Sequence, residues 1–210
     1  MIATPVIANK SSREPVFFVH GFLSKRLLMK PLQWQVGRYG FPTAGWGYPS
    51  YLGSLKWHAS RLRPVLEQFS RQHEQFHVVA HSMGSIVFRL AMEYGPLNGL
   101  GRVVLMAPPN QGTPTARLIS PLFCLFCAGV PELSDKPASL VHHIKTPQPL
   151  EIGIIAGRFD WIVPRSRTPL PCQVDHICVK STHNTMLVQP RVARRVVEFL
   201  ENGHFQRETS

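Results

Sequence analysis

The sequence predicts an α/β fold in which helices cover both faces of a mostly parallel sheet. Short continuous apolar runs, such as residues 76–80, have the composition of strands that are buried on both sides. Segments with apolar residues at helical spacing separate these runs, and residues 54–73 are the longest of them. This alternation of strands and helices favours a parallel sheet between two helical layers.

The expected elements follow from the same two patterns. Strands are expected at residues 15–20, 42–48, 76–80, 102–107, 151–156 and 174–180. Helices are expected at residues 27–39, 54–73, 86–94 and 190–201, and the last of them begins at Pro190 and stops at Gly203. Residues 111–150 lack clean periodicity and contain many prolines. We expect them to form a small cap or a substrate-facing loop, with a core helix around residues 122–130 as the alternative.

The length and composition predict a single domain over residues 1–210. A chain of 210 residues that is 44% hydrophobic and 17% charged can bury a core of useful size, and no shift in composition marks a second domain. Residues 1–15 lack the long apolar segment of a secretory signal. The most apolar stretch, residues 118–130, is shorter than a bilayer span and contains Pro121. These features predict cytoplasmic localisation without a transmembrane helix.

The chain is strongly basic. Its 23 Lys and Arg residues outnumber 12 Asp and Glu residues, which gives a formal net charge of +11 and favours anionic partners. The basic residues are dispersed over separate elements, and the sequence contains no recognisable nucleic-acid-binding module. We expect a solvated basic surface with weak affinity for anionic membranes and no nucleic-acid partner. The sequence does not define the oligomeric state.

Cys124, Cys127, Cys172 and Cys178 raise the question of metal binding or redox chemistry. The first pair has C-x-x-C spacing, but it lies in an apolar run without the Gly, Pro or polar residues of a redox turn. Cys178 alternates along an expected strand as a core thiol would. Buried free thiols are favoured, with a disulfide as the alternative, and neither a metal site nor a cofactor is expected.

The motif with the clearest chemical meaning lies at Ser82, where the strand of residues 76–80 meets a helix. In a nucleophile elbow, the residues two before and two after the serine must be small, because strand and helix crowd at a strained turn. Ala80 and Gly84 meet this requirement, although Ala80 departs from G-x-S-x-G by one methyl group. The helix directs its free N–H groups and positive dipole end at the space above the serine. The alternative is an ordinary strand and helix, with Ser82 and Ser85 as caps.

A glycine-containing loop at His20, Gly21 and Phe22 follows the first expected strand. An oxyanion hole needs one N–H group from the residue after the nucleophile and a second from a loop that follows a neighbouring strand. The predicted donors are therefore the backbone N–H groups of Phe22 and Met83. The alternative is a glycine turn that only closes a core strand.

A nucleophilic serine needs a histidine to accept its proton and a carboxylate to orient that histidine. The partners are expected just after strands, because the carboxyl ends of parallel strands share one edge of the sheet. His183 and Asp160 each follow an expected strand, whereas His176 and Asp175 begin one. Asp135 lies in the irregular segment with nothing to fix it. The pattern predicts His183 as the base and Asp160 as the acid.

These motifs make the chain resemble the α/β-hydrolase superfamily, and more closely its small bacterial lipases and esterases, some of which also have alanine at the first elbow position. The resemblance covers nearly the whole chain through HGF at 20–22, AHSMG at 80–84, APPNQGT at 107–113, GRFDWIVP at 157–164 and THNTML at 182–187. The order Ser82, Asp160, His183 is also that of the superfamily. The resemblance implies a minimal α/β-hydrolase fold with a small cap, in which the first two strands of larger members are missing or degenerate.

The resemblance also implies a cofactor-free ester hydrolase that works through an acyl-enzyme. In that mechanism Ser82 attacks the ester, His183 transfers the proton, Asp160 orients His183, and the N–H groups of Phe22 and Met83 hold the oxyanion. His20 and His81 would belong to the architecture at the strand ends and would not be catalytic.

The residues next to these motifs predict a pocket for the apolar acyl group of a small-molecule or lipid ester. The pocket residues are Leu23, Trp161, Ile162, Met186 and Leu187. The fold and the triad do not determine which kind of acyl bond is cleaved or whether water or an alcohol accepts the acyl group. Thioester hydrolysis, amide hydrolysis and acyl transfer are therefore alternatives. A further alternative is a binding protein that keeps the fold without turnover.

Overall fold

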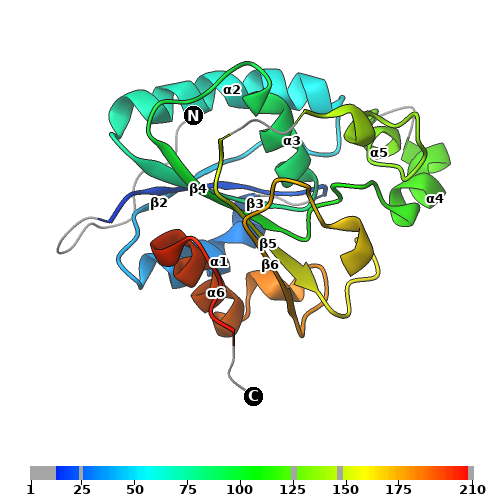
Figure 1. Ribbon diagram of the computed structural model, residues 1–210. Helices are drawn as coiled ribbons and strands as arrows, with labels where there is room; N and C mark the ends of the chain where they lie inside the picture. Colours follow the sequence, from blue (N-terminus) through cyan, green and yellow to red (C-terminus); the bar gives the residue numbers. More distant parts are fainter. Residues whose placement is uncertain (1–12, 24–25, 124–126, 146–148, 208–210) are drawn as a thin grey trace.

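The computed structural model describes residues 13–23, 26–123, 127–145 and 149–207, and it confirms the predicted α/β fold. Within these residues, one six-stranded sheet runs through the molecule, and every strand pair in it is parallel (Figure 1). From one edge to the other, its strands are β2 (Thr43–Trp46), β1 (Val16–Val19), β3 (Phe76–His81), β4 (Leu100–Met106), β5 (Ile152–Gly157) and β6 (Asp175–Val179).

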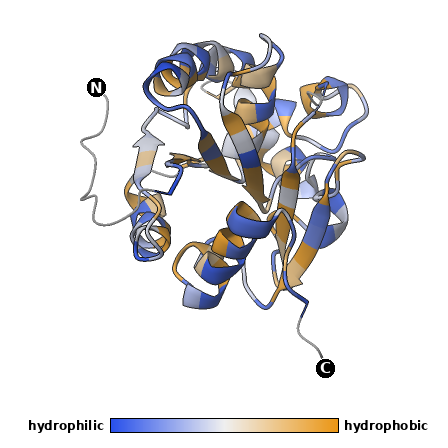
Figure 2. Ribbon diagram, turned by 60° about the vertical axis from the view of Figure 1, so that its left-hand side comes forward, coloured by the Kyte–Doolittle hydropathy of each residue, from blue (hydrophilic) through white to orange (hydrophobic). Residues whose placement is uncertain are grey.

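Helices cover both faces of the sheet. On one face lie α2 (Leu55–Gln72) and α3 (Met83–Met92), and on the other lie α1 (Lys30–Gly37) and α6 (Pro190–Asn202) (Figure 1). A separate apolar cluster fills the space between the sheet and each helical layer. Figure 2 shows this arrangement, with apolar strands in the interior and hydrophilic outer sides on the helices. The fold therefore presents the carboxyl ends of all its strands along one edge.

Local sequence explains where the amphipathic helix α2 begins and where α6 begins and ends. The side chain of Ser54 accepts a hydrogen bond of 3.1 Å from the N–H of Trp57 and caps α2. Helix α6 begins at Pro190, as predicted, and ends before Gly203, whose φ of 77° is one that glycine adopts without strain.

Two of the expected helices differ in detail from the sequence-based prediction. The segment at residues 27–39 begins as a 3-10 turn at Arg26–Met29 and becomes α-helical only at α1. Helix α3 ends at Met92, so Tyr94, the last residue of the helix expected at 86–94, lies beyond the helix and is exposed. The turn at Gly95, with φ of 122°, follows immediately and directs the chain away.

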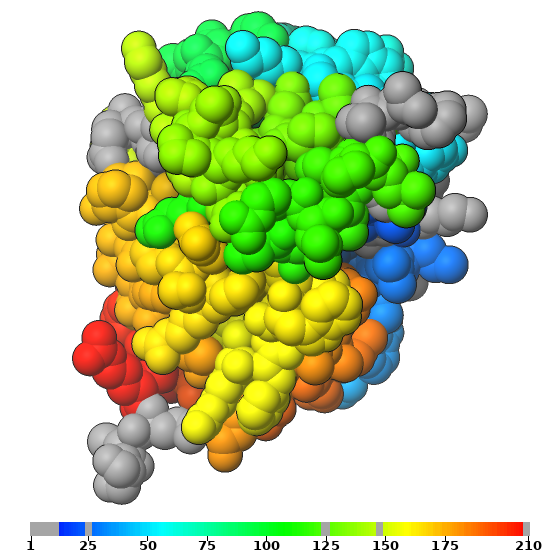
Figure 3. Space-filling view, turned by 90° about the vertical axis from the view of Figure 1, so that its right-hand side faces the viewer, coloured from blue at the N-terminus to red at the C-terminus, as the bar shows by residue number. Residues whose placement is uncertain are grey.

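The described residues of the 111–150 segment form short elements beside the carboxyl edge of the sheet. These are α4 (Pro114–Phe123), α5 (Gly129–Glu132) and a 3-10 helix at Leu140–His143. Residues 124–126, in the middle of the core helix considered as the alternative at 122–130, lie outside the described residues. Hydroxyl groups of Thr113 and Thr115 donate to carbonyls of the loop that follows β5, those of Ile162 and Trp161. Figure 3 shows this face, where α4 in green borders that loop in yellow.

The cysteines that the structure describes are free thiols. Cys127 is buried, whereas Cys172 and Cys178 are half-buried. Cys124, and with it the C-x-x-C pair, lies outside the described residues. In the same part of the chain, no helix combines the length and apolar character needed to cross a membrane.

Candidate active site

The turn between β3 and α3 holds Ser82 in a strained conformation. Its φ of 54° and ψ of −129° are rare for a residue with a side chain, and such strain concentrates at functional sites. A side chain at Gly84 would place its Cβ 2.4 Å from the carbonyl oxygen of His20, so only glycine fits where α3 crosses the end of β1. Ser82 does not cap α3 with its side chain, and the Ser85 hydroxyl donates to the carbonyl of Ala80 over 3.0 Å. The capping alternative therefore does not describe either serine.

Three polar side chains from three different loops meet at this turn. Nε2 of His183 lies 2.8 Å from Oγ of Ser82, and Nδ1 of His183 lies 2.7 Å from Oδ2 of Asp160. All three residues are more than 90% buried. Because the carboxylate can only accept, Nδ1 carries the ring proton and leaves Nε2 free to accept the proton of the serine.

Backbone groups fix the carboxylate of Asp160. Its Oδ1 accepts hydrogen bonds from the N–H groups of Ile162 and Val163, at 3.0 and 2.9 Å. With Oδ1 held in this way, Oδ2 faces the imidazole of His183. The loop after β5 thus positions the carboxylate before any substrate binds.

The competing acids and bases lie elsewhere. His176 and Asp175 are at the beginning of β6, where the ring of His176 bonds the hydroxyl of Thr168 over 3.1 Å. Asp135 lies within 3.5 Å of two arginines, Arg117 and Arg167. The structure therefore brings together the predicted Asp160 and His183 with Ser82 and keeps the alternatives away from them.

The loop after β1 lies directly against Ser82. A Cβ built on Gly21 would lie 2.8 Å from Cβ of Ser82 and 3.4 Å from its Oγ, which explains why a glycine stands there. Phe22 follows and is half-buried against the core under α3. Met83 is the first residue of α3, a position whose N–H has no acceptor within the helix. Of the two predicted oxyanion donors, Met83 thus directly follows the serine, and Phe22 directly follows the glycine that lies against it.

Several solved structures have the same arrangement of strands and helices as this chain. A mature lipase of Bacillus licheniformis superimposes with a TM-score of 0.79 at 15% identity over 97% of each chain. The chain has the α/β-hydrolase fold. A monoacylglycerol lipase of Paleococcus ferrophilus aligns at 0.64 and 14% identity over 97% of this chain and 99% of its own. A meta-cleavage product hydrolase of Pseudomonas fluorescens aligns at 0.61 and 17% over 94% and 93%.

Comparison by sequence identifies no relative of this chain. No protein-family model matches the chain, and no curated protein matches it by sequence. The assignment therefore rests on the architecture, including the parallel sheet whose edges are β2 and β6.

Tyr48, which sequence reasoning missed, holds the loop that carries the predicted donor Phe22. Its hydroxyl donates to the carbonyl of His20 over 2.8 Å, and its N–H donates to Nε2 of the same residue over 3.3 Å. The two rings stack with centroids 4.3 Å apart. Burial raises the pKa of Tyr48 and lowers that of His20, so both side chains stay neutral. Tyr48 follows β2, and only the pairing of β2 with β1 brings it to His20.

His81 supports the backbone of His183. Its Nε2 donates to the carbonyl oxygen of His183 over 3.0 Å, and the two rings lie 4.8 Å apart. Burial, with a contribution from the charge that His183 can carry, holds the pKa of His81 well below its ordinary value. A neutral His81 agrees with the architectural role expected for it.

A second position that the sequence did not indicate is the buried Arg89 of α3. Its guanidinium donates to Oδ1 of Asn110 over 3.0 Å and to the carbonyl of Ile144 over 3.1 Å, and Nδ2 of Asn110 donates to the carbonyl of Thr168 over 2.6 Å. Burial lowers the pKa of Arg89 to about 10, which still leaves it charged at neutral pH. This network ties α3 to the cap segment and to the loop before β6.

The five predicted pocket residues separate into two groups. Leu23, Trp161 and Ile162 lie on loops at the carboxyl edge, and the first two are exposed. Met186 and Leu187, by contrast, are fully buried in the core cluster beneath the other face of the sheet. A 3-10 turn at Thr185–Leu187 directs these two side chains inward, so they support the loop of His183 from below and do not line a surface that substrate can reach.

The described residues contain no group of three or more His, Cys, Asp or Glu side chains arranged to hold a metal ion.

Proposed function

We propose that the protein is a serine hydrolase that cleaves carboxylic esters with apolar acyl groups. The observation that carries this proposal is the continuous hydrogen-bond chain from Ser82 through His183 to Asp160 at a strained strand-to-helix turn. That arrangement activates a serine hydroxyl at neutral pH, because the proton has an acceptor and the acceptor has a fixed tautomer. The lipases and hydrolases that share the fold support the same chemistry.

The proposed reaction has two halves. Oγ of Ser82 bonds to the ester carbonyl carbon as its proton passes to Nε2 of His183, and the N–H groups of Phe22 and Met83 stabilise the negative carbonyl oxygen. The intermediate collapses, the C–O bond to the alcohol breaks, and His183 returns its proton to the leaving oxygen. Water then attacks the acyl-enzyme by the same steps, releases the carboxylic acid and restores the serine. Asp160 stabilises the imidazolium in both halves.

Exposed apolar side chains around the site favour an apolar acyl group. Leu23 follows the predicted oxyanion loop, Phe159 and Trp161 flank Asp160, and Leu118 and Leu122 project from α4; each is at least 58% exposed. Hydrogen bonds from the beginning of α4 to the loop of Trp161 join these segments at one edge. Exposed apolar side chains gathered on these segments favour the binding of apolar groups.

A series of p-nitrophenyl esters with acyl chains from acetate to laurate tests this proposal. We expect kcat/KM to rise about fourfold for each of the first few methylenes, because each buried methylene contributes about 0.8 kcal/mol, and then to level off. Matched thioester and anilide substrates serve as the comparison. A flat or falling ester series would contradict the apolar acyl site, and a preference for the thioester would replace the proposed substrate class with the alternative.

Tyr48→Phe tests the proposed oxyanion hole without touching the reacting groups. The change removes the hydroxyl that donates to the carbonyl of His20, so the loop of Phe22 keeps the ring stacking and the backbone hydrogen bond but loses its shortest bond to Tyr48. We expect kcat to fall between about ten- and a hundredfold while KM changes little, because a small misplacement affects the transition state more than substrate binding. Tyr51→Phe is the matched control, since Tyr51 is exposed. Equal falls in the two variants, or a change confined to KM, would contradict this role for Tyr48.

A further inference from the structure

A groove of about 730 Å³ runs along the outer edge of the sheet, away from the candidate active site. Five consecutive residues line one side of it, His176, Ile177, Cys178, Val179 and Lys180, which take in most of β6. The other side comes from α6 and the segment after it, through Arg191, Arg194, Arg195, Glu198, Gln206 and Arg207. Among the described strands β6 ends the sheet order, so this groove accompanies an edge strand.

The lining shows that the groove follows the edge of β6 and not one of its faces. Ile177 and Val179 pack against the apolar cluster that contains α6. His176 points to the other side, where its ring bonds Thr168. Since successive side chains of a strand point to opposite faces, a groove lined by all of them must expose the strand edge between. An edge strand offers backbone N–H and C=O groups that a further strand can pair with.

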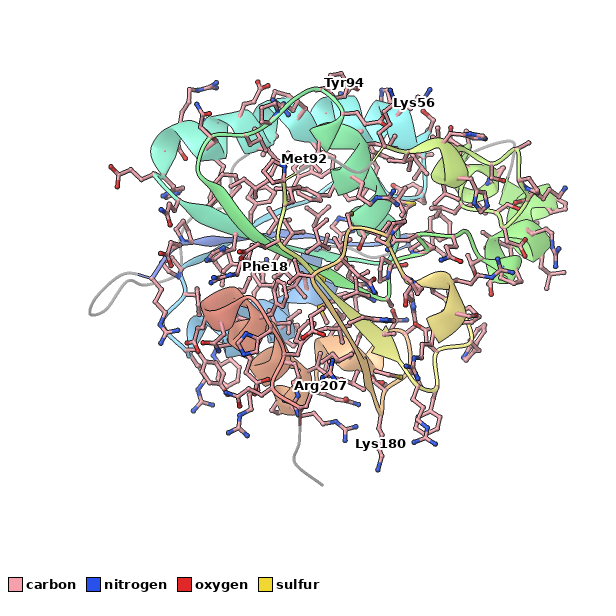
Figure 4. The ribbon with its side chains drawn as sticks, in the orientation of Figure 1. Phe18, Lys56, Met92, Tyr94, Lys180 and Arg207 are labelled. Atoms are coloured by element: carbon pink, nitrogen blue, oxygen red, sulfur yellow. The ribbon has the colours of Figure 1, made fainter. Side chains whose placement is uncertain are left out.

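The walls of the groove are strongly basic. Five of the eleven lining residues are Lys or Arg, and Glu198 is the one carboxylate among them. Glu198 already lies 2.9 Å from Arg195 and 3.9 Å from Arg194. In Figure 4 the side chains of Lys180 and Arg207 project from the lower side of the molecule, opposite Lys56 on α2. Five basic side chains and one carboxylate therefore line the groove along the edge of β6, where Arg191 already donates a hydrogen bond to the carbonyl of Lys180.

We propose that this groove binds an extended acidic segment of another protein, which adds a strand to β6. Backbone pairing with the edge would supply register, and carboxylates along the segment would meet the arginines of α6. A second copy of this chain fits poorly, because its net charge is also +11. The concave shape does not match a planar bilayer. The described residues that line the groove include no Phe, Tyr or Trp on which bases could stack.

The probe is a fluorescein-labelled octapeptide of alternating glutamate and valine, with binding followed by fluorescence anisotropy at low ionic strength. The control is the same peptide methylated on every second backbone nitrogen. This peptide keeps the charge and lacks the N–H hydrogen-bond donors along one edge. We expect saturable binding that weakens as salt rises and an affinity at least about tenfold lower for the methylated peptide. Equal affinity for the two peptides would leave only charge attraction and overturn strand addition, as would the absence of binding at low salt.

Charge reversal locates the site. Arg191→Glu combined with Arg194→Glu should weaken binding at least about tenfold, since both side chains are exposed on the wall of the groove. Lys56→Glu combined with Arg71→Glu makes the same change on exposed positions of α2 and should have little effect. An equal loss of peptide affinity in the two double variants would show that binding depends only on net charge, and this result would overturn the proposal.

Cys178 gives a readout in the unmodified protein. It is half-buried in the groove, whereas Cys172, also half-buried, lies outside the groove lining. Bound peptide should slow alkylation of Cys178 by iodoacetamide severalfold relative to Cys172, as followed by mass spectrometry. Unchanged alkylation at saturating peptide would overturn the assignment. Tighter binding of anionic vesicles or duplex DNA than of the peptide, lost on reversing Arg191 and Arg194, would also overturn it in favour of those partners.

Discussion

Replacing Ser82 with alanine should abolish ester hydrolysis while the protein remains folded. In the proposed mechanism Oγ of Ser82 forms the covalent bond, and no other group at the turn can replace it. Removal of a nucleophile of this kind costs about four orders of magnitude or more in kcat. Alanine adopts the strained turn no less readily than serine, so the free energy of unfolding should change by about 1 kcal/mol or less. Initial rates with a short-chain ester and a thermal melt measure the two effects.

Ser85→Ala is the matched control for Ser82→Ala. Ser85 is also buried and lies one helical turn away, but its hydroxyl donates to the carbonyl of Ala80 and not to a proposed catalytic group. The control should lose about 1 kcal/mol of stability with its buried hydrogen bond and keep most of its activity. Retained turnover in a clean preparation of Ser82→Ala would contradict the elbow as the site of attack.

His183→Ala should cause a loss comparable to that of Ser82→Ala. Its Nε2 lies 2.8 Å from Oγ of Ser82, and without it the serine proton has no acceptor. Because the two residues act as a unit, the double variant should be no slower than either single variant, to within a fewfold. The measurement is kcat of both single variants and the double variant with one ester.

His176→Ala is the comparison for His183→Ala, because His176 lies at the beginning of the strand that His183 follows. Its ring bonds Thr168 at the start of β6, so the change should affect stability and leave kcat nearly unchanged. An essential His176 with a dispensable His183 would show that the base had been assigned to the wrong end of the strand.

The sequence was sufficient to predict the sheet and to place Ser82, Asp160 and His183 at its carboxyl edge. Continuous apolar runs mark buried parallel strands, and parallel strands bring the residues that follow them to one edge. Position relative to the strand end was therefore enough to choose His183 over His176 as the candidate base, without knowledge of any contact. The requirement for a small residue at Gly84 came from the same local geometry.

Features that depend on contacts between distant elements could not be predicted in this way. Tyr48 meets His20 only through the register of two neighbouring strands, and Arg89 meets Asn110 only after α3 packs on the sheet. The inward direction of Met186 and Leu187 depends on a short 3-10 turn that has no periodic signal. In each case the local pattern fits several environments, and tertiary packing selects one.

The most direct test of the proposed mechanism is labelling with a fluorophosphonate, which forms a covalent bond only with an activated serine. We expect stoichiometric modification of wild-type protein, with the added mass on the peptide that contains Ser82. His183→Ala should label far more slowly, and Ser85→Ala should label like the wild type. Labelling at another serine, or no labelling of folded wild-type protein, would contradict the assignment of Ser82 as the nucleophile.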